Sequence, residues 1–527
     1  MGLINIISPA WALKRAQAKA ALNIMSGASG DGGGYESASR KRQVFKNWLT
    51  SPADAQTDIN IGIKDLRHRS RDLEKNNHLA HGALATKLQY VIGGGLQPEP
   101  AIDYEFLNLD AAEAETINAN IKRVFLKFAN DKRGDYRELK DFFEMQADVY
   151  HAKNLNGDAW VLLPWIEDKG TPFNTRLHAI EADRICNPGE KKDTEKMRNG
   201  LTFDDRGRIK KIHIAPSHPG QGKKQKADQW KTVNFKRANG WLNVLHIANK
   251  NNRPGQVTGV PDLTPVMSAI KQMGAYIDAE LLGSVISNKF TVFVKSNTPG
   301  AANGLQPGGG MMQPGQQTAD DYGDEDPLEL GDGLVVSLGQ DEEIQLANPS
   351  RPNPNFGPYI DKLATHIGSA LGLPFELLLK HFTASYSASK AALLMFTNWL
   401  AVERLAMVRG FCRPVFELII DEAVASGRLV LPGYLADDDK RAAYLQCAWH
   451  GAPIGEIDEL KSANAAKVRM ESRTTNRSIE TRRLGHEVDQ VRQGIASEKR
   501  KDEAAGLPPV ESLAPPDDEP TNQIDKE

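Results

Sequence analysis

The apolar residues of this chain recur at three- and four-residue spacing over its longest segments, which predicts long amphipathic helices. The clearest case, residues 264–288, predicts a helix of about twenty-five residues, or roughly 37 Å at 1.5 Å per residue. We expect Thr264 to cap this helix and Pro265 to occupy its first position. The apolar stripe of the helix consists of Val266, Ile270, Met273, Ile277, Leu281 and Val285.

Two further long helices are expected in the second half of the chain. One covers 355–371, and a much longer one of about 39 residues, or roughly 58 Å, follows the loop PFELLLKHFTASYSA. Ser387 or Ser389 is the expected N-cap of the longer helix, and Pro414 predicts a kink just before it. We expect the helix to contribute ordinary core residues at Leu393, Phe396, Leu400 and Leu405.

A mixed pattern of helices and short strands is expected between residues 61 and 262. Helices are predicted over 61–91, 111–130 and 138–155, and the three glycines at 93–95 end the first of them. Strands are predicted within DAWVLLPWI, RLHAI, GLTFDD, IKKIHIA and WLNVLHIA.

The remaining segments surround this part of the chain. Strands are predicted at KFTVFVKS, GLVVSLG and EIQLA, around an acidic loop rich in Gly and Pro. A run of short polar helices is predicted from DDDKRAAYLQCAWHG to VDQVRQGIASEKRKDEA. We expect an N-terminal arm and a C-terminal tail without a core of their own. The whole pattern predicts a helix-rich α+β protein.

Charge and composition narrow the function classes. The net charge of the 527 residues is −3, so no global basic charge indicates nucleic-acid binding. Ten acids and one lysine lie between Lys295 and Gln345, whereas the first 95 residues are basic, with thirteen Lys/Arg and seven Asp/Glu. The three scattered cysteines fit a reducing cytoplasm. We expect no signal peptide and no membrane span, because no uncharged apolar run reaches about 18 residues.

Several basic segments leave their roles open. The N-terminal arm is as consistent with a solubilising extension as with a contact to DNA or a capsid, and HPGQGKKQKADQWK is interpreted as a surface loop. The basic residues of the arm are Lys14, Arg15, Lys19, Arg40, Lys41 and Arg42.

Motifs of catalysis are not found in the sequence. It has no GxxxxGK[ST] phosphate loop and no GxSxG nucleophile turn. His78 and His81 form an HxxH pair without a third ligand at a defined spacing, so we predict no metal site there. We therefore predict no enzyme, no cofactor and a structural or mechanical role.

Four stretches of the chain resemble the lambda-type phage portal proteins. They are RHRSRDLEKNNHLAHGALATKLQYVIGGGLQPEP, NRPGQVTGVPDLTPVMSAIKQMGAYIDAELLGS, HIGSALGLPFELLLKHFTASYSASKAALLMF and EIDELKSANAAKVRMESRTTNRSIETRRLG. They occur in the order of that family and cover most of the chain between about residues 60 and 505. In the last stretch, Glu459 stands where the family pattern has Pro.

The resemblance implies a head–tail connector. Such a protein forms a homo-oligomeric ring, usually a dodecamer, at one capsid vertex, and double-stranded DNA enters and leaves through its channel. The implied partners are the terminase large subunit, head-completion proteins, and the major capsid and scaffold proteins. The implied location is the virion, with assembly in the host cytoplasm. Alternatives are a helical scaffold or adaptor without a channel, or an enzyme of the packaging motor.

The family fold divides this chain into an arm, a wing, two stem helices around a clip, a tunnel loop, a long kinked helix and a crown. The expected boundaries, with a final acidic tail, are 1–60, 61–262, 263–288, 289–354, 355–371, 372–388, 389–430, 431–505 and 506–527.

The resemblance also supplies candidate site residues. Lys380, His381 and Phe382 are candidates for a loop that faces the DNA channel, and the alternative is a loop packed against a neighbouring subunit. Acids in the clip are candidates for docking the motor, with a calcium site or a solvated loop as alternatives. These acids are Asp320, Asp321, Asp324, Glu325 and Asp326.

Overall fold

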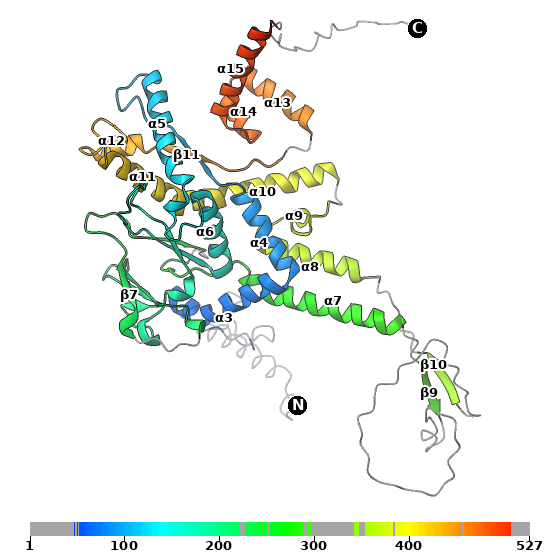
Figure 1. Cartoon of the computed structure of the whole chain (residues 1–527). Coiled ribbons are helices and arrows are strands. Elements are labelled where there is room, and N and C mark those ends of the chain that lie inside the picture. Colours follow the sequence, from blue (N-terminus) through cyan, green and yellow to red (C-terminus); the bar gives the residue numbers. More distant parts are fainter. Residues whose placement is uncertain are drawn as a thin grey trace, which may run out of the picture. The chain divides into compact units, whose positions relative to one another are not determined.

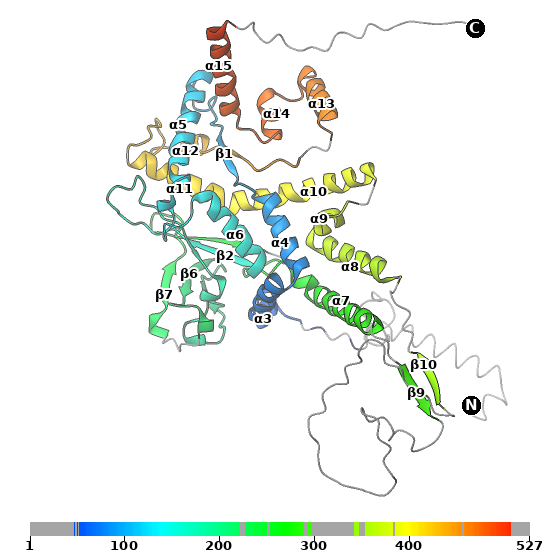
Figure 2. The ribbon, with the colours of Figure 1, turned by 45° about the vertical axis from the view of Figure 1, so that its right-hand side comes forward.

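The computed structural model of this chain is a helix-rich α+β protein (Figures 1 and 2). The residues that it describes are Asn47, Thr50, 52–221, 227–249, 253–288, 292–296, 342–346, 354–382, 385–455 and 458–506. The chain divides into two compact units, and the smaller comprises Met1–Ile61 with Arg253–Gly255. In that smaller unit, the Arg253 guanidinium donates to the Asp58 carboxylate and to the Ala53 carbonyl, each at 3.0 Å.

The predicted helix over 61–91 is two helices, so its continuity was wrong. Helix α3 covers Ala55–Asn76 and α4 covers His78–Val91. Between them, Asn77 has an extended backbone, and its side chain accepts hydrogen bonds from the N–H groups of Leu79 and Ala80. An Asn side chain that satisfies these free N–H groups starts a new helix, which the hydrophobic spacing alone does not reveal.

The next two predicted helices are confirmed, although one begins later than expected. Helix α5 covers Ala111–Ala129 and α6 covers Phe142–Asn156 rather than beginning at residue 138. A capping box starts each of them, from Asp110 with Glu113 and from Asp141 with Glu144.

Small antiparallel sheets accompany these helices. A three-stranded sheet has the order β3-β2-β8, in which β2 lies at the centre, and a four-stranded sheet has the order β4-β5-β6-β7. The strands of the first sheet are Asp158–Leu162 (β2), His178–Ile180 (β3) and Val244–Ala248 (β8). The strands of the second sheet are Met197–Arg198 (β4), Leu201–Phe203 (β5), Ile209–Ile214 (β6) and Lys231–Asn234 (β7). All five strands predicted in this region are confirmed, whereas β4 and β7 were missed.

Another pairing joins distant parts of the sequence. Strand β1 (Gln97–Pro100) pairs with β11 (Cys447–His450), with Gln97 opposite His450. The prediction of one helix over DDDKRAAYLQCAWHG was therefore wrong in its second half. Helix α12 covers only Asp438–Tyr444, and the residues of β11 pair with a strand about 350 residues earlier, a partner that local propensity cannot reveal.

The long helices occur where their apolar spacing predicts them. After a short 3₁₀ turn at Thr264–Val266, α7 covers Met267–Asn288, and α8 covers Phe356–Leu371 (Figure 1). Pro265 lies in the first turn, at the second position rather than the expected first. Thr264 is not the N-cap, because Leu263 takes that position without a side-chain hydrogen bond.

The predicted interruption before Pro414 is confirmed as a π-helical turn. Helix α10 covers Tyr386–Met407, the π-turn covers Val408–Cys412, and α11 covers Arg413–Ala425. Pro414 therefore lies in the first turn of α11, where its missing N–H leaves the fewest helical hydrogen bonds unmade. The C-terminal helices α13, α14 and α15 cover Glu459–Glu471, Arg477–Arg483 and Val488–Ala505.

Of the three hydrophobic clusters among the described residues, two join the helices of the larger unit and the third lies between its sheets. The first contains packed rings from α5, α6, the π-turn, α11 and β11, with centroids 5.1–6.4 Å apart. These rings are Phe125, Phe142, Phe411, Phe416 and Trp449. The second cluster joins α4, the first half of α7, α8 and the inner face of α10.

A close backbone crossing sets the start of the central strand. Gly157 ends α6 at φ 85°, and a Cβ there would lie 2.6 Å from the Gly259 carbonyl. A Cβ on Gly259 would in turn lie 1.9 Å from the Gly157 oxygen. The next residue, Asp158, accepts a hydrogen bond from the Gly259 N–H at 2.9 Å. No larger residue fits at either glycine without separating the two segments.

We expect Gly157→Ala to lower the free energy of unfolding by roughly 2–4 kcal/mol, because strain at positive φ adds to the clash with Gly259. The matched control is Gly207→Ala, at φ 76° with nothing within 4 Å of the added Cβ. Gly207→Ala introduces the backbone strain without a clash, so it should lower the free energy of unfolding by only about 1 kcal/mol. Urea unfolding of both variants measures the difference, and equal losses would contradict the role of the crossing.

Candidate functional site

The segment between α8 and α10, which includes the expected tunnel loop, is anchored at its base. Gly372 ends α8 at φ 71°, and a Cβ there would lie 2.6 Å from the Trp399 indole nitrogen. The short helix α9 (Phe375–Leu379) follows, with Leu377 and Leu378 buried in the second hydrophobic cluster. The start of the segment is therefore fixed to the same core as α10.

The chain reverses at Lys380, the first candidate residue. Lys380 ends α9 in the left-handed conformation at φ 54°, and its N–H donates to the Glu376 carbonyl. The His381 N–H donates to the same carbonyl at 3.1 Å. A non-glycine residue in this conformation carries strain, which the buried leucines of α9 offset.

The side chains of Lys380, His381 and Phe382 are all exposed, and Phe382 keeps 55% of its surface accessible. Among the described residues, none forms a hydrogen bond or ion pair with these three side chains. The structure thus brings the three candidates together at one exposed turn. Their contact with DNA or with a neighbouring subunit stays a prediction.

Helix α10 begins earlier than expected, so both predicted caps were wrong. Ser385 is the N-cap, and its side chain accepts from the Ala388 N–H at 3.4 Å. Ser387 lies in the first turn, and Ser389 is buried within the helix. Ser385, Ser387 and Ser389 all have a residue type that caps helices, and the cap is Ser385 because the helix begins at Tyr386.

Polar contacts fix the inner face of α10. Glu403 accepts a hydrogen bond from the Lys153 ammonium at 2.7 Å and from the Tyr150 hydroxyl at 3.3 Å. Burial raises the pKa of the Tyr150 hydroxyl, and the Glu403 charge adds to this. The next residue, Arg404, donates to the Tyr90 carbonyl at 2.7 Å. These contacts hold α10 in one rotational setting against α4 and α6.

The outer face of α10 is apolar and uncovered. We call its four large exposed side chains the α10 strip: Leu394, Met395, Val402 and Leu405, which are 62%, 75%, 65% and 45% exposed. At 3.6 residues per turn they fall within about 100° of one another, opposite the buried Phe396, Leu400 and Met407. The expected core role is thus confirmed for Phe396 and Leu400 and wrong for Leu405. Four exposed large apolar side chains on one helix face indicate a partner.

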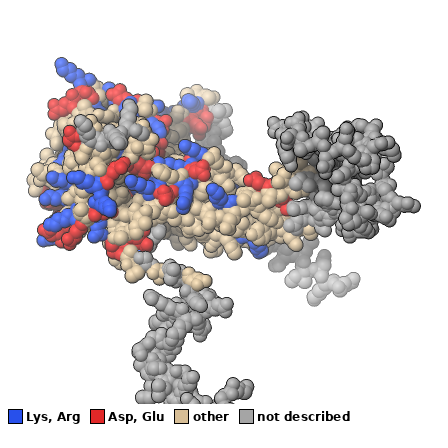
Figure 3. Space-filling view, turned by 90° about the horizontal axis from the view of Figure 1, so that it is seen from below, with Lys and Arg blue, Asp and Glu red and all other residues tan. Residues whose placement is uncertain are grey.

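The pair formed by α7 and α8 is similar. Tyr276 of α7 packs on Phe356 and Tyr359 of α8, with ring centroids 5.7 and 5.1 Å apart. The predicted stripe of α7 is buried only in its first half, since its exposed members include Leu281 and Val285. The surface over these helices is mostly uncharged (Figure 3). Its charged residues are Lys271, Asp278, Glu280, Asp361 and Lys362.

The second candidate group lies outside the described residues. Asp320, Asp321, Asp324, Glu325 and Asp326 belong to a segment between β9 (Val292–Ser296) and β10 (Glu342–Leu346) that the structure does not describe. The two strands, both predicted, pair antiparallel with Val294 opposite Ile344. The role of the acids stays a prediction.

A buried ionic network that the sequence reasoning missed connects α3 to the central sheet. The Arg67 guanidinium donates to Asp158 at 2.7 Å, to Asp183 at 3.2 Å and to the Asn156 carbonyl at 3.0 Å. Arg71, one turn later, donates to Asp183 at 2.6 Å. The signal in the sequence was two arginines four residues apart on one helix face, together with two acids next to apolar strands, Asp158 at the start of β2 and Asp183 after β3.

One group of possible metal ligands occurs among the described residues, formed by Glu181, Asp183 and His218. Asp183 already accepts from two guanidinium groups, so its charge is compensated without a metal ion. The HxxH pair is not part of this group. His81 instead lies 3.8 Å from the Glu74 carboxylate.

Comparison with known proteins identifies one family. Residues 41–404, more than half of the chain, match the family model described as phage portal protein, lambda family. A search of curated proteins finds no match.

Solved structures show distant likeness. The virion of a native gene transfer agent (GTA) particle gives a TM-score of 0.38 at 11% identity, with 81% of this chain and 94% of that chain covered. The neck of a native GTA particle, computed with C12 symmetry, gives 0.37 at 11% identity, with 73% and 93% covered. The neck of an empty GTA particle, computed with C6 symmetry, gives 0.36 at 12% identity, with 71% and 93% covered.

The ionic network predicts a pH dependence of stability. Burial alone would raise the pKa of Asp183, but Arg67 and Arg71 outweigh it and lower the pKa below its ordinary value of 3.8. The stabilisation is therefore complete above the unfolded-state pKa and is lost as the pH falls through the lower folded-state pKa.

We expect Asp183→Asn to lower the free energy of unfolding at neutral pH by about 1–3 kcal/mol, because Arg67 and Arg71 each lose a charged acceptor and keep only Asp158 and Glu181, respectively. The difference from wild type should shrink between about pH 5 and about pH 3 in urea unfolding. The control is Asp205→Asn, whose side chain is 92% exposed and should change little. A constant difference across this pH range would contradict the role of the Asp183 charge.

Proposed function

The chain belongs to the lambda family of phage portal proteins, and from that membership we propose that its copies close into a ring around a channel for double-stranded DNA. The ring occupies one vertex of the capsid, assembles in the host cytoplasm and stays in the virion. It acts as a conduit and docking platform and catalyses no reaction.

The family fold suggests how the parts divide this work. Residues 61–262 form the wing, the stem consists of 263–288 and 355–371, and 289–354 form the clip. The segment 372–388 is the tunnel loop, and Lys380, His381 and Phe382 face the DNA at its exposed turn. The region of the long helix is 389–430, within which α11 ends at Ala425, and the crown is 431–505.

The main structural support for a ring is the exposed α10 strip. A folded single chain does not leave four large apolar side chains along one helix face without a partner, since burying each is worth about 1.5–3 kcal/mol. The inner face of the same helix is fixed by Lys153 and Glu403, so α10 cannot rotate to bury the strip in its own core. We assign the strip to the contact between neighbouring copies.

Other occupants fit the α10 strip less well. DNA binds through cations that neutralise phosphates, and the strip has none. Helix α10–α11, Tyr386–Ala425, is long and apolar enough to cross a membrane by length and composition. Its inner face, however, packs in the core at Phe396 and forms an ion pair at Glu403, so we propose no membrane contact.

The stem suits a conduit through its low charge. A wall dense in cations would hold DNA by counterion release and oppose sliding. Helices α7 and α8 carry three acids and two lysines, which gives phosphates little to bind. We propose that Lys380 adds a sparse cation in the channel.

The proposed partners meet different parts of the ring. The terminase large subunit docks on the clip during packaging, with the acids at 320–326 as its contact, and head-completion proteins replace it afterwards. Major capsid and scaffold proteins surround the wing. The alternative function is a helical scaffold or adaptor of head assembly without a channel, which the oligomeric state distinguishes.

We expect the double variant Met395→Glu/Val402→Glu to remain folded and to lose ring assembly, because each carboxylate would be buried without a partner between copies. Light scattering and negative-stain images measure the change from annular particles to single chains. The matched control is Thr397→Glu, exposed on α10 but outside the strip, which should still assemble. Normal rings of the double variant, or a wild type that stays a single folded chain, would refute the proposed contact.

We expect Lys380→Glu to leave ring assembly intact and to reduce DNA packaging or retention by about tenfold, because a carboxylate in place of the ammonium repels the DNA phosphates at the tunnel loop. DNA protected from nuclease in assembled capsids measures the effect. Lys236→Glu, an exposed change of the same charge on the wing, is the control. Wild-type packaging by the Lys380 variant would remove this residue from the channel contact.

A further inference from the structure

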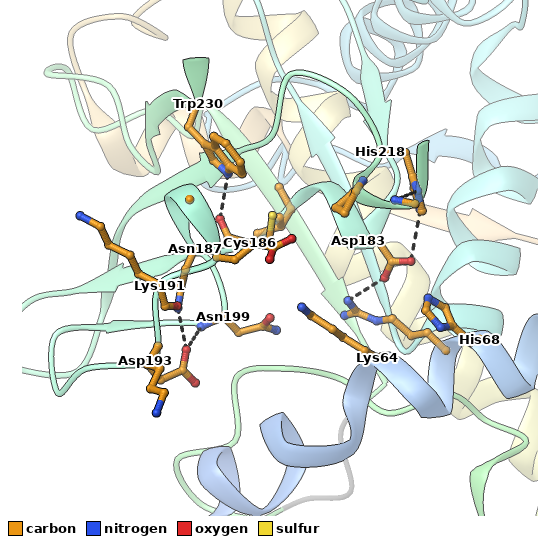
Figure 4. Close-up of a pocket in the computed structure, with 17 residues that line it drawn as sticks. Lys64, His68, Asp183, Cys186, Asn187, Lys191, Asp193, Asn199, His218 and Trp230 are labelled. Carbon is orange, nitrogen blue, oxygen red and sulfur yellow. Dashed lines mark hydrogen bonds and ion pairs between the residues drawn. The ribbon is translucent and has the colours of Figure 1, made fainter. Parts of the chain in front are cut away.

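A hollow of about 770 Å³ in the wing has no part in the proposed function (Figure 4). It lies between α3 and the loops that surround the four-stranded sheet, entirely within the larger of the two units. Its volume is typical of pockets that hold small molecules, about 300–1,000 Å³. Its wall includes Lys64, Cys186, Lys191, Lys192, Asn199 and Trp230.

Two of the three acids that line this hollow already accept hydrogen bonds from neighbouring side chains or backbone. Asp183 is held by two arginines, and Asp193 accepts from the Asn187 amide at 2.8 Å and from the Asn199 N–H at 2.9 Å. Glu190, the remaining acid of the lining, is exposed at the rim. Asp193 and Glu190 keep their charges, so apart from the paired Arg67 and Asp183 the lining has three lysines against two carboxylates.

The cations of the lining are, in contrast, mostly unmatched. Arg67 is saturated by its three acceptors, but Lys64, Lys191 and Lys192 form no ion pair with another described residue. Figure 4 shows Lys64 reaching from α3 toward the hollow. An excess of positive charge in a concave site favours an anionic ligand.

An aromatic wall faces this charge. The Trp230 indole N–H donates to the Cys186 carbonyl at 3.2 Å, which fixes the ring orientation. In Figure 4, Trp230 and Lys64 lie on opposite sides of the hollow. An indole face accepts a planar ring by stacking, and a lysine accepts a phosphate.

The walls are formed before any ligand arrives. The Gly200 N–H donates to the Asn187 side chain at 2.6 Å, and a Cβ on Gly200 would lie 2.5 Å from the Cys186 nitrogen. The loops of Cys186 and Gly200 are therefore locked together at the base of the hollow. A preformed wall lowers the entropy that binding costs.

We propose that this hollow binds a nucleoside phosphate, with its phosphates at Lys64 and its base against Trp230. A free nucleotide and the 5′-phosphorylated end of a DNA strand share this chemistry. Binding involves no covalent step and is independent of ring assembly, so it can hold whether or not the channel proposal does.

Calorimetric titration of the full chain tests the proposal with dATP, a 5′-phosphorylated oligonucleotide, inorganic triphosphate and deoxyadenosine. We expect saturable binding of dATP below about 1 mM, and at least tenfold weaker binding of the two fragments, because each lacks one half of the contact. Tighter binding of the oligonucleotide than of dATP would identify a DNA end as the source, and the reverse order a free nucleotide.

Variants assign the binding to the hollow. Lys64→Glu and Trp230→Leu should each weaken dATP binding at least about tenfold, whereas Trp230→Phe retains the stacking face and most of the affinity. The matched controls outside the hollow are Lys210→Glu and Trp165→Leu, and circular dichroism checks that every variant folds. No saturable binding by wild type, or equal losses in test and control variants, would overturn the proposal.

Discussion

The arrangement of the larger unit depends on one buried ion pair, Arg67 with Asp158. Arg67 comes from α3 and also reaches the carbonyl of Asn156 at the end of α6, while Asp158 begins the central strand β2. The other oxygen of Asp158 bonds to His246 of β8 at 2.7 Å and to the Gly259 N–H at 2.9 Å, a few residues before α7 begins. A buried charge is tolerated only with all its partners in place, so these segments are positioned together or not at all.

Much of the helical fold followed from apolar spacing, because long periodic segments are the strongest local signal. Of the missed strands, β1 depends on a distant partner, whereas β4 and β7 pair with strands nearby in the sequence. Strand β1 exists because β11 pairs with it, and the division at Asn77 depends on a side chain that competes with the backbone. Thr264 has a residue type that caps helices, but it lies inside the 3₁₀ turn that precedes α7, so Leu263 takes the cap position.

Less of the candidate site could be predicted. The resemblance located an exposed turn at Lys380, His381 and Phe382, which the structure describes, but one chain cannot show what faces them. Leu405 was expected in the core because its helical spacing fits an apolar stripe, and spacing does not distinguish a buried apolar face from an exposed one. The hollow near Trp230 has no sequence motif, since its wall comes from loops that only the fold brings together.

The π-turn at Val408–Cys412 has a consequence for evolution of the assembly. A single inserted or deleted residue rotates one side of a helix relative to the other by about 100°, whereas a substitution leaves this phase unchanged. The direction of the outer face of α10 relative to the buried α11 is therefore set by the number of residues in the turn between them, and it changes only in steps of one residue. If copies contact one another through that face, its direction sets the angle between neighbouring copies and so the number of copies in a closed ring. Substitutions would leave this angle unchanged, whereas an inserted or deleted residue would change it abruptly.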